Sequence, residues 1–500
     1  MSGGQRFSAD NICLGVVPEQ NQALQSCEYA GGVLSVSLNS ASDHSNPSPP
    51  APVGPRTLFR IASNIAWLFG DRIFRMGVGV LVTLAVARYL GPAQFGVLNY
   101  GVAIVSLFGA VACLGTDTIV VRDLVRDGKH ASTTLGTAFF LRLPASLLAT
   151  VLCLTLAWFQ RGDRATAVVL AVVSTTLLFQ NADILDLFFQ SEISSKHTVI
   201  AKNLAFAAAA ILRVALVCTK SPLIGFAICN VVESILGAAL LCAIYLRHPV
   251  RITGWRYASD YARRLMRDSW PLVISGTAIM IYMRIDIVML GRMAGPAAVG
   301  VYAAATRISE LWYFIPVAIV SSVSPVIIAS RSDPVLYYSR IQQLFSLMLL
   351  LSATIGAVVA LSSGVLIQRL FGPAFIQAGP VLAIHIWAGI FVFQGMAQLP
   401  WDTSENMMRL SLVRTVAGAV SNIVINLYLI PLYGAKGAAI ATVVSYALST
   451  LVGNLLFRET RGIFVMQIRA LRLSGCSELL ATLASLRSTQ PKPVAPKEIL

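Results

Sequence analysis

Fourteen ionisable side chains lie inside stretches of the sequence that are otherwise apolar, and half of them are arginines. They are Asp71, Arg72, Arg75, Arg142, Asp183, Asp186, Lys202, Arg213, Glu233, Arg284, Asp286, Arg307, Glu310 and Arg414. A guanidinium group stays protonated, is weakly hydrated and binds phosphate oxygens bidentately. A cavity lined by arginines would therefore hold a phosphate-bearing head group while excluding neutral apolar molecules. A buried carboxylate can take up a proton or balance a nearby cation.

The stretches that carry these residues predict membrane-spanning helices. The chain is 56% hydrophobic and 12% charged, with a mean hydropathy of +0.72. Soluble proteins carry about 25% charged residues, so a water-soluble fold is excluded. Each apolar run of about 20 residues can cross a hydrocarbon core about 30 Å thick. We predict an all-α polytopic membrane protein with about 12 transmembrane helices, at 61–87, 95–115, 135–158, 165–188, 198–218, 223–246, 271–291, 299–328, 342–361, 380–398, 411–430 and 436–457.

The eighth predicted span, 299–328, is too long for one straight crossing. Pro316 and Pro325 are expected to kink it or to end it early, because proline lacks the backbone N–H that a helix needs.

A charge facing lipid at mid-membrane costs about 2.5–3.5 kcal/mol, so fourteen of them cannot all face lipid. They must line a watery interior, pair with one another, or reach the interface by snorkelling. Lys202 and Arg414, near predicted cytoplasmic ends, are expected to snorkel. Asp71 and Arg75 have the i, i+4 spacing of a helical ion pair. Arg307 and Glu310, spaced i, i+3, are a second candidate pair.

The remaining arginines are candidates for a cationic cleft. The set is Arg142, Arg213, Arg284 and Arg307, with Arg72 and Arg75. Arg284 is close to Asp286 in sequence, but two residues along a helix is the wrong face for a direct pair. Pairing with acids on other helices would satisfy these arginines equally well. The candidate acids, for ion coupling or for charge balance, are Asp183, Asp186, Glu233, Asp286 and Glu310.

The orientation of the chain follows from the basic residues in its short loops. The formal charge is +15, which in a membrane protein usually records basic cytoplasmic loops rather than a nucleic-acid partner. With the N-terminus inside, the inner segments carry 19 Lys and Arg residues and the outer loops carry 7. The positive-inside rule therefore places both termini in the cytoplasm.

An internal repeat divides the chain into two halves. Arg88-Tyr-Leu-Gly-Pro-Ala-Gln-Phe-Gly-Val97 aligns without gaps to Arg292-Met-Ala-Gly-Pro-Ala-Ala-Val-Gly-Val301, and six of the ten positions are identical. Each copy follows the first helix of its half, and the offset is 204 residues. Because six helices restore the orientation of the chain, the halves form a parallel repeat around a central cleft, as in many transporters. A tight Gly-Pro turn alone would not explain the constant offset.

These observations define five segments. Residues 1–56 are predicted to be a disordered cytoplasmic extension, 57–246 the first six-helix half, 247–268 a basic cytoplasmic hinge loop, 269–457 the second half, and 458–500 a cytoplasmic tail. The tail contains an apolar series between 463 and 486 that is compatible with an interfacial amphipathic helix or with disorder.

Several signals of other functions are missing from the sequence. There is no GxxxxGK[ST] phosphate-binding loop, and the eight cysteines form no CxxC pair, so no ATPase module, metal or cofactor is predicted. His385 is isolated in an apolar helix and is interpreted as a packed core residue. The outer loops are short, which argues against an enzyme such as a membrane-embedded transferase.

Several segments resemble bacterial polysaccharide flippases. Asn64–Trp67 and the segment 86–100 resemble the start of these proteins, and 114–122 and 286–304 resemble later parts. The most specific match is Asn426-Leu-Tyr-Leu-Ile-Pro-Leu-Tyr-Gly-Ala-Lys-Gly-Ala-Ala-Ile-Ala-Thr442. The resemblance covers roughly residues 58–457, and the extension 1–56 departs from the family, which usually begins close to the first helix.

The resemblance implies a flippase for O-antigen or exopolysaccharide repeat units in the multidrug/oligosaccharidyl-lipid/polysaccharide exporter superfamily. Such proteins move an undecaprenyl-diphosphate-linked oligosaccharide from the cytoplasmic to the periplasmic leaflet of the bacterial inner membrane. The family's cleft is thought to be cationic, and this role is carried here onto Arg142, Arg213, Arg284 and Arg307. Membrane lipids, a polysaccharide polymerase and a chain-length regulator are the implied partners. The alternatives are an exporter of small cationic drugs, which would need an acidic cleft, and the transferase.

Overall fold

The computed structural model describes residues 55–160, 163–192, 196–247 and 252–471, with side chains from Arg75 onward. These described residues form helices joined by short turns, without a strand. The first half contains α1 (Pro55–Ala112), α2 (Asp117–Arg126), α3 (Ala131–Phe159), α4 (Arg164–Ser174), α5 (Thr176–Phe179), α6 (Asp183–Ser191), α7 (Lys196–Cys218) and α8 (Leu223–Tyr245). The second half contains α9 (Ser259–Met293), α10 (Pro296–Glu310), α11 (Phe314–Ala329), α12 (Pro334–Phe371), α13 (Ala378–His385), α14 (Ala388–Ser404), α15 (Met408–Tyr433), α16 (Ala435–Ala447), α17 (Gly453–Leu456) and α18 (Arg461–Leu471).

The predicted all-α membrane architecture is confirmed. Eleven helical segments of the described chain are long and apolar enough to cross a membrane. The first of them contains Gly91, whose φ of 69° and ψ of 174° divide α1 into two arms. The predicted eighth span breaks at the 3-10 turn Leu311–Tyr313, between α10 and α11. That break directly precedes Pro316, which cannot donate to the carbonyl four residues earlier, whereas Pro325 lies within α11.

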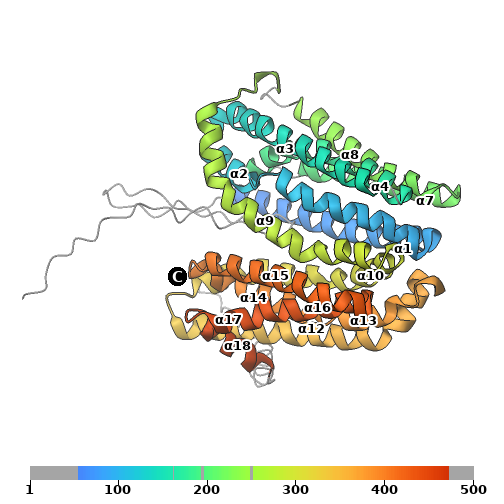
Figure 1. Cartoon of the computed structure of the whole chain (residues 1–500). Helices are drawn as coiled ribbons and strands as arrows, with labels where there is room; N and C mark the ends of the chain where they lie inside the picture. The colour runs from blue at the N-terminus through green and yellow to red at the C-terminus, as the bar shows by residue number, and fades with distance from the viewer. Residues whose placement is uncertain (1–54, 161–162, 193–195, 248–251, 472–500) are drawn as a thin grey trace, which may run out of the picture.

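The helices form two lobes, drawn above and below one another in Figure 1. Helices α2 to α8 pack mainly among themselves and on α1, and α11 to α18 pack mainly among themselves and on α10, while α1 and α10 form the most extensive helix–helix contact of the described chain. Helix α9 contacts both lobes, with α1 on one side and α15 on the other. Apart from those of α9, the larger contacts between the lobes join α1 to α10, to α12 and to the turn Pro373–Phe375. The position of the predicted domain boundaries, including the hinge 247–268, remains a prediction, although its last part, from Ser259, is already helical in α9.

One end of the bundle is built from glycine turns. Gly91 and Gly295, equivalent positions of the sequence repeat, have φ values of 69° and 84°, with ψ of 174° and 172°. Gly372 repeats this geometry after α12, with φ 89° and ψ 175°, and is followed by Pro373. Gly434 also has a positive φ, of 56°. These conformations favour glycine, which has no β-carbon to clash. We call this end the glycine-turn end, and the opposite end, where α1 begins and α18 lies, the termini end.

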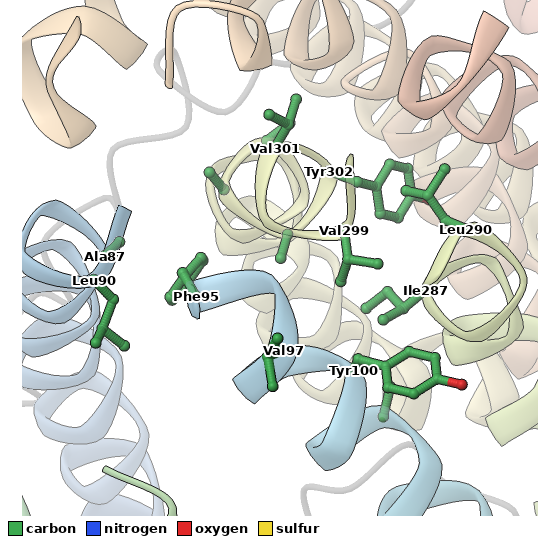
Figure 2. Close-up of a cluster of buried hydrophobic side chains, with 14 of the residues drawn as sticks. Ala87, Leu90, Phe95, Val97, Tyr100, Ile287, Leu290, Val299, Val301 and Tyr302 are labelled. Carbon is green, nitrogen blue, oxygen red and sulfur yellow. The ribbon is translucent and has the colours of Figure 1, made fainter. Parts of the chain in front are cut away.

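The two copies of the repeat contact each other at the glycine-turn end. A β-carbon on Gly96 would lie 1.8 Å from the carbonyl oxygen of Pro296, and one on Gly300 would lie 1.9 Å from that of Pro92. The offset of 204 residues relates Gly96 to Gly300 and Pro92 to Pro296, so the contact is reciprocal. We call it the repeat contact. It lies within a buried apolar cluster contributed by both lobes, with Phe95, Val97, Val299 and others drawn in Figure 2.

Each lobe has a buried or half-buried ion pair between its fourth and fifth membrane helices. The Lys202 ammonium lies 2.9 Å from Asp183 and 2.7 Å from Asp186. The Arg414 guanidinium lies 2.7 Å from Asp402, with 7% and 4% of the two side chains exposed. The prediction that Arg414 snorkels is wrong, and Lys202 also pairs within its lobe. The acids that hold these cations come from neighbouring helices, which local spacing rules do not reveal.

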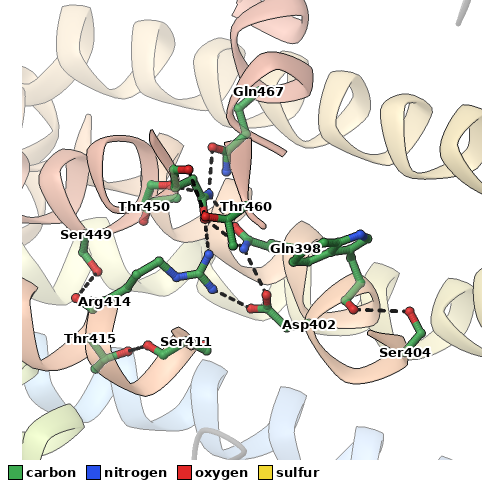
Figure 3. Close-up of polar contacts among 12 residues, drawn as sticks. Gln398, Asp402, Ser404, Ser411, Arg414, Thr415, Ser449, Thr450, Thr460 and Gln467 are labelled. Carbon is green, nitrogen blue, oxygen red and sulfur yellow. Dashed lines mark hydrogen bonds and ion pairs between the residues drawn. The ribbon is translucent and has the colours of Figure 1, made fainter. Parts of the chain in front are cut away.

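The Arg414–Asp402 pair belongs to a larger polar network that includes the chain's last described helix (Figure 3). Arg414 also hydrogen bonds to the amide oxygen of Asn454, and Asn454 donates to Gln398 at 2.8 Å and to Gln467 of α18 at 3.1 Å. Helix α18 turns Ile463, Met466, Gln467 and Ala470 inward. Of the two alternatives for the tail, a helix is present over Arg461–Leu471, where it packs on the second lobe. The rest of the predicted series, beyond residue 471, lies outside the described residues.

Candidate functional site

The lobes meet at Gly300 but have separated at Arg307, two helical turns further along α10. Seven residues correspond to about 700° of helix rotation and about 10 Å of rise, so both residues lie on the same face of α10. Gly300 touches the other lobe at Pro92. Residues 299–306 and 308–309 are all buried, and Arg307 between them is exposed. The face of α10 that the other lobe closes at Gly300 is therefore accessible at Arg307.

Arg307 belongs to a charged cluster formed by both lobes. It lies within electrostatic reach of Arg284 and Glu310 from its own lobe and of Arg213 from α7 of the other lobe. Arg284 lies 4.0 Å from Glu310. Arg213 lies 2.8 Å from Glu233 of α8, with 17% and 28% of these side chains exposed. We call these five residues the inter-lobe cluster.

The inter-lobe cluster has an excess of positive charge. It contains three guanidinium groups and two carboxylates, and each carboxylate pairs with an arginine of its own lobe. Among the described residues, Arg307 forms no hydrogen bond or ion pair, although Glu310 and Arg284 are close. Asn230 accepts a further hydrogen bond from Arg213 at 3.0 Å. An anion entering this space therefore meets the guanidinium of Arg307, and those of Arg213 and Arg284, which already pair with carboxylates.

The other predicted cleft arginines lie elsewhere or are not described. Arg75 of α1 packs its guanidinium 5.5 Å from the ring centre of Phe206 on α7. Phe206 and Arg213 are seven residues apart on one face of α7, so Arg75 borders the same side of this helix. The side chains of Asp71 and Arg72 fall outside the described residues, and the predicted pair Asp71–Arg75 remains a prediction.

Arg142 does not join the inter-lobe cluster. Only 2% of it is exposed, and it donates to the Thr116 hydroxyl at 2.8 Å and to Asp117 at 2.5 Å. Thr116 and Asp117 follow Leu114 and Gly115, which both have positive φ and break the helix between α1 and α2. Arg142 therefore holds this break in place inside the first lobe. Spacing along one helix does not predict this pair, because Asp117 lies 25 residues away, on another helix.

The predicted carboxylates fall into two groups. Four of them lie close to a cation of the same lobe: Asp183 and Asp186 to Lys202, Glu233 to Arg213, and Glu310 to Arg284. Asp286 differs, since among the described residues it forms no ion pair and only 3% of it is exposed. The separation of these acids into ion-coupling and charge-balancing roles stays a prediction.

Asp286 is held by neutral donors inside the second lobe. Its carboxylate accepts hydrogen bonds from Tyr302 at 2.8 Å, Thr442 at 2.6 Å and Asn426 at 2.5 Å. These residues come from α10, α16 and α15. The predicted core residue His385 lies near this network. Its ring stands edge-on to Tyr302 at 5.7 Å, and its Nδ1 is 2.9 Å from the Ser309 hydroxyl.

Sequence reasoning missed the residues that complete these clusters. Asn230, Tyr302 and Thr442 are uncharged polar residues in apolar helices, and that contrast is the sequence signal that marks them. Within the part of the chain that has described side chains, no group of three His, Cys, Asp or Glu residues is arranged to hold a metal ion.

Two lobes of membrane-crossing helices with a charged cluster between them define the class, a two-lobed polytopic membrane protein. The chain belongs to the family of polysaccharide biosynthesis proteins. The sequence model of that family matches residues 61–331, which is more than half of the chain.

Two curated relatives come from Haloferax volcanii. The chain is 27% identical over 185 residues to a probable flippase, AglR, covering 35% of this chain and 37% of that protein. It is 24% identical over 402 residues to a probable low-salt glycan biosynthesis flippase, Agl15, covering 77% of this chain and 81% of that protein. The first match thus spans little more than a third of its relative, whereas the second spans most of it.

Solved structures share the fold. An inward-facing multidrug resistance MATE transporter of the MOP superfamily has a TM-score of 0.61 at 14% identity, covering 78% of this chain and 95% of that one. The lipid II flippase MurJ, in an inward closed conformation, also has a TM-score of 0.61, at 12% identity, covering 86% of this chain and 94% of that one. At these identities the likeness establishes the architecture alone.

Proposed function

We propose that this protein is a flippase that moves undecaprenyl-diphosphate-linked oligosaccharide repeat units across the bacterial inner membrane, for O-antigen or exopolysaccharide synthesis. The observation that supports the proposal is the inter-lobe cluster, in which Arg213 of one lobe and Arg284 of the other both lie within electrostatic reach of the accessible Arg307. Guanidinium groups from two directions suit the oxygens of a diphosphate, which presents anionic faces on two phosphorus atoms.

The family and the relatives support the same class of substrate. The family is one of polysaccharide biosynthesis, and both curated relatives are probable flippases, one of them in glycan biosynthesis. Arg142 is left out of the proposed site because it is buried against Asp117. Arg72 and Arg75 remain proposed contributors, the latter because it borders α7 near Arg213.

In the proposed mechanism, the two lobes rock to give alternating access. The glycine-turn end faces the periplasm and both termini lie in the cytoplasm, as the basic loops predict. The head group enters between the lobes from the termini end, while its polyprenyl tail stays in lipid. A diphosphate with about two negative charges gains about 4.6 kcal/mol on moving outward across 100 mV, inside negative. Export of the anion is therefore electrically downhill.

An exporter of small cationic molecules is the second candidate, and the sign of the cluster disfavours it. Such a site needs an excess of carboxylates, whereas three arginines and two glutamates converge here. The transferase alternative has no support from the two curated relatives, which are probable flippases. The polymerase and chain-length regulator remain expected partners of the assembly pathway.

The test is genetic complementation with direct detection of the lipid intermediate. Deleting the gene in its host is expected to remove surface glycan and to accumulate lipid-linked repeat units on the inner leaflet. The wild-type gene is expected to restore surface glycan, and the triple variant Arg213→Ala, Arg284→Ala, Arg307→Ala to fail at equal protein level. Arg267→Ala, at a side chain 73% exposed on α9 outside the cluster, is the matched control and is expected to complement. Full complementation by the triple variant would contradict the proposed site.

A further inference from the structure

The repeat contact is made entirely of backbone. The Cα of Gly96 faces the Pro296 carbonyl and the Cα of Gly300 faces the Pro92 carbonyl, with no room for a side chain at either glycine. A carbon–oxygen contact normally measures about 3.3–3.6 Å, so a methyl group at either position would push the lobes apart by about 1.5 Å. Both glycines lie within helices with ordinary helical φ, where alanine is otherwise well accepted.

Further contacts surround the repeat contact and connect the same two lobes. Arg88, from the first copy of the repeat, donates to the carbonyl oxygen of Leu370 at 2.7 Å and also to that of Arg369, at the end of α12. The C-terminal end of a helix carries partial negative charge, so a guanidinium there is favourable. Phe95 packs edge-on against Phe375 at 6.0 Å.

The position of the repeat contact relative to the inter-lobe cluster gives it a role. It lies on the same face of α10 as Arg307, about 10 Å nearer to the glycine-turn end. Any head group bound at the cluster and released at the glycine-turn end must pass between Gly96 and Pro296 and between Gly300 and Pro92. The repeat contact joins backbone to backbone, so rotamer changes in the apolar side chains around it cannot open it, and the lobes themselves must part.

We propose that the repeat contact is the outer gate of the transporter, a two-fold backbone seal that opens only by separation of the lobes. The proposal rests on the alternating access of the proposed function. The seal is reciprocal, so a rotation that breaks one glycine–carbonyl contact breaks the other with it. Arg88 is a strap that holds the sealed state from the outer surface.

Gly96→Ala and Gly300→Ala are expected to keep the two lobes from closing fully at the repeat contact. The reporter is a cysteine at position 307 (Arg307→Cys), placed in a full-length chain that lacks the eight native cysteines. Intact spheroplasts are treated with a membrane-impermeant maleimide. The reporter in the otherwise unchanged chain is expected to label poorly from outside and readily after permeabilisation. Each glycine variant is expected to raise outside labelling several-fold. Gly364→Ala, where a β-carbon meets open space on α12, is the matched control and is expected to change nothing.

Arg88→Ala provides a second variant that adds no bulk to the buried contact. It removes the strap from an exposed side chain, so folding is not at risk, and it is expected to raise outside labelling as well. The gate proposal is overturned if none of the three variants labels more than Gly364→Ala, or if the reporter in the unchanged gate is already labelled from outside. Labelling needs no substrate, so this result is independent of the complementation test. If the gate is correct but the cargo is not, the gate variants raise labelling while the triple arginine variant still complements. If the cargo is correct but the gate is not, the triple variant fails to complement while the gate variants leave labelling unchanged.

Discussion

Arg284 and Asp286 are two residues apart on α9 and take part in different polar clusters. Arg284 lies 4.0 Å from Glu310, in the cluster between the lobes. Asp286 accepts hydrogen bonds from Tyr302 and Thr442 inside the second lobe. Glu310 and Tyr302 both belong to α10, so α9 and α10 are joined by polar contacts on two sides. A movement of α10 toward a bound anion would therefore change the hydrogen bond between Tyr302 and Asp286.

Arg307 is expected to be the most sensitive single position of the inter-lobe cluster. Arg307→Lys keeps the charge but loses the bidentate geometry that phosphate recognition uses, so we expect export between those of the wild type and Arg307→Ala. The measurement is surface glycan in the complemented deletion strain at matched protein level. Equal export by the lysine and wild-type proteins would show that a point charge suffices there.

Asp286→Ala is expected to destabilise the second lobe. The substitution removes the acceptor that Tyr302, Thr442 and Asn426 share. The Tyr302 and Thr442 hydroxyls keep other acceptors nearby, whereas one N–H of Asn426 is left buried and unsatisfied, at a cost of about 1–3 kcal/mol. Thermal unfolding of the detergent-purified protein should show a lower midpoint than that of Tyr302→Phe, which removes one donor. A midpoint for Asp286→Ala at or above that of Tyr302→Phe would argue that the network contributes little to stability.

Breaking the Arg414–Asp402 pair from one side is expected to cost more than replacing both partners. Arg414→Ala leaves a buried carboxylate without its cation, and such losses are about 3–5 kcal/mol. The double variant Arg414→Met, Asp402→Leu removes both charges and keeps volume, so its thermal midpoint should lie closer to that of the wild type. The two variants would unfold at the same temperature if the pair were solvated rather than buried.

Helix α18 is expected to be part of the folded second lobe. A chain ending after Thr460 loses Gln467, which bonds to Asn454, and the Met466 carbonyl, which accepts from Gln342 at 3.1 Å. It also uncovers apolar side chains of the lobe that Ile463 covers. We expect a lower thermal midpoint and less protein in membranes. A chain ending after Leu471 keeps every described contact of α18 and serves as the control, expected to match the full chain in midpoint.

Composition and the internal repeat predicted the architecture well, because both can be read from the sequence without knowing which helices pack together. Apolar runs record the lipid environment directly, and the match of 88–97 to 292–301 predicted two equivalent segments, which the structure places in contact. The third Gly-Pro turn, at Gly372, carries the same Arg-x-x-Gly-Pro-Ala pattern, which begins at Arg369. Its signal was available in the sequence.

The candidate site was only partly predictable. The sequence named Arg213, Arg284 and Arg307, because a charge in an apolar helix is costly wherever it lies. It did not separate them from Arg142, whose partner Asp117 lies beyond a break in the preceding helix. It also assigned Arg414 to the interface, because Asp402 is on another helix. Which charges meet depends on helix packing, and spacing along one helix carries no information about it.

The reciprocal glycine–carbonyl contact is the kind of contact that two identical subunits make with each other, which bears on how a chain with two halves could have arisen. In an isologous interface, the same patch serves both partners, each giving what it receives. A six-helix unit with one glycine four residues after one proline would present both halves of such an interface, and two identical copies could close on each other at that end. The present contact between Pro92 and Gly300, and between Pro296 and Gly96, is what fusion of such a self-associating ancestor would leave behind.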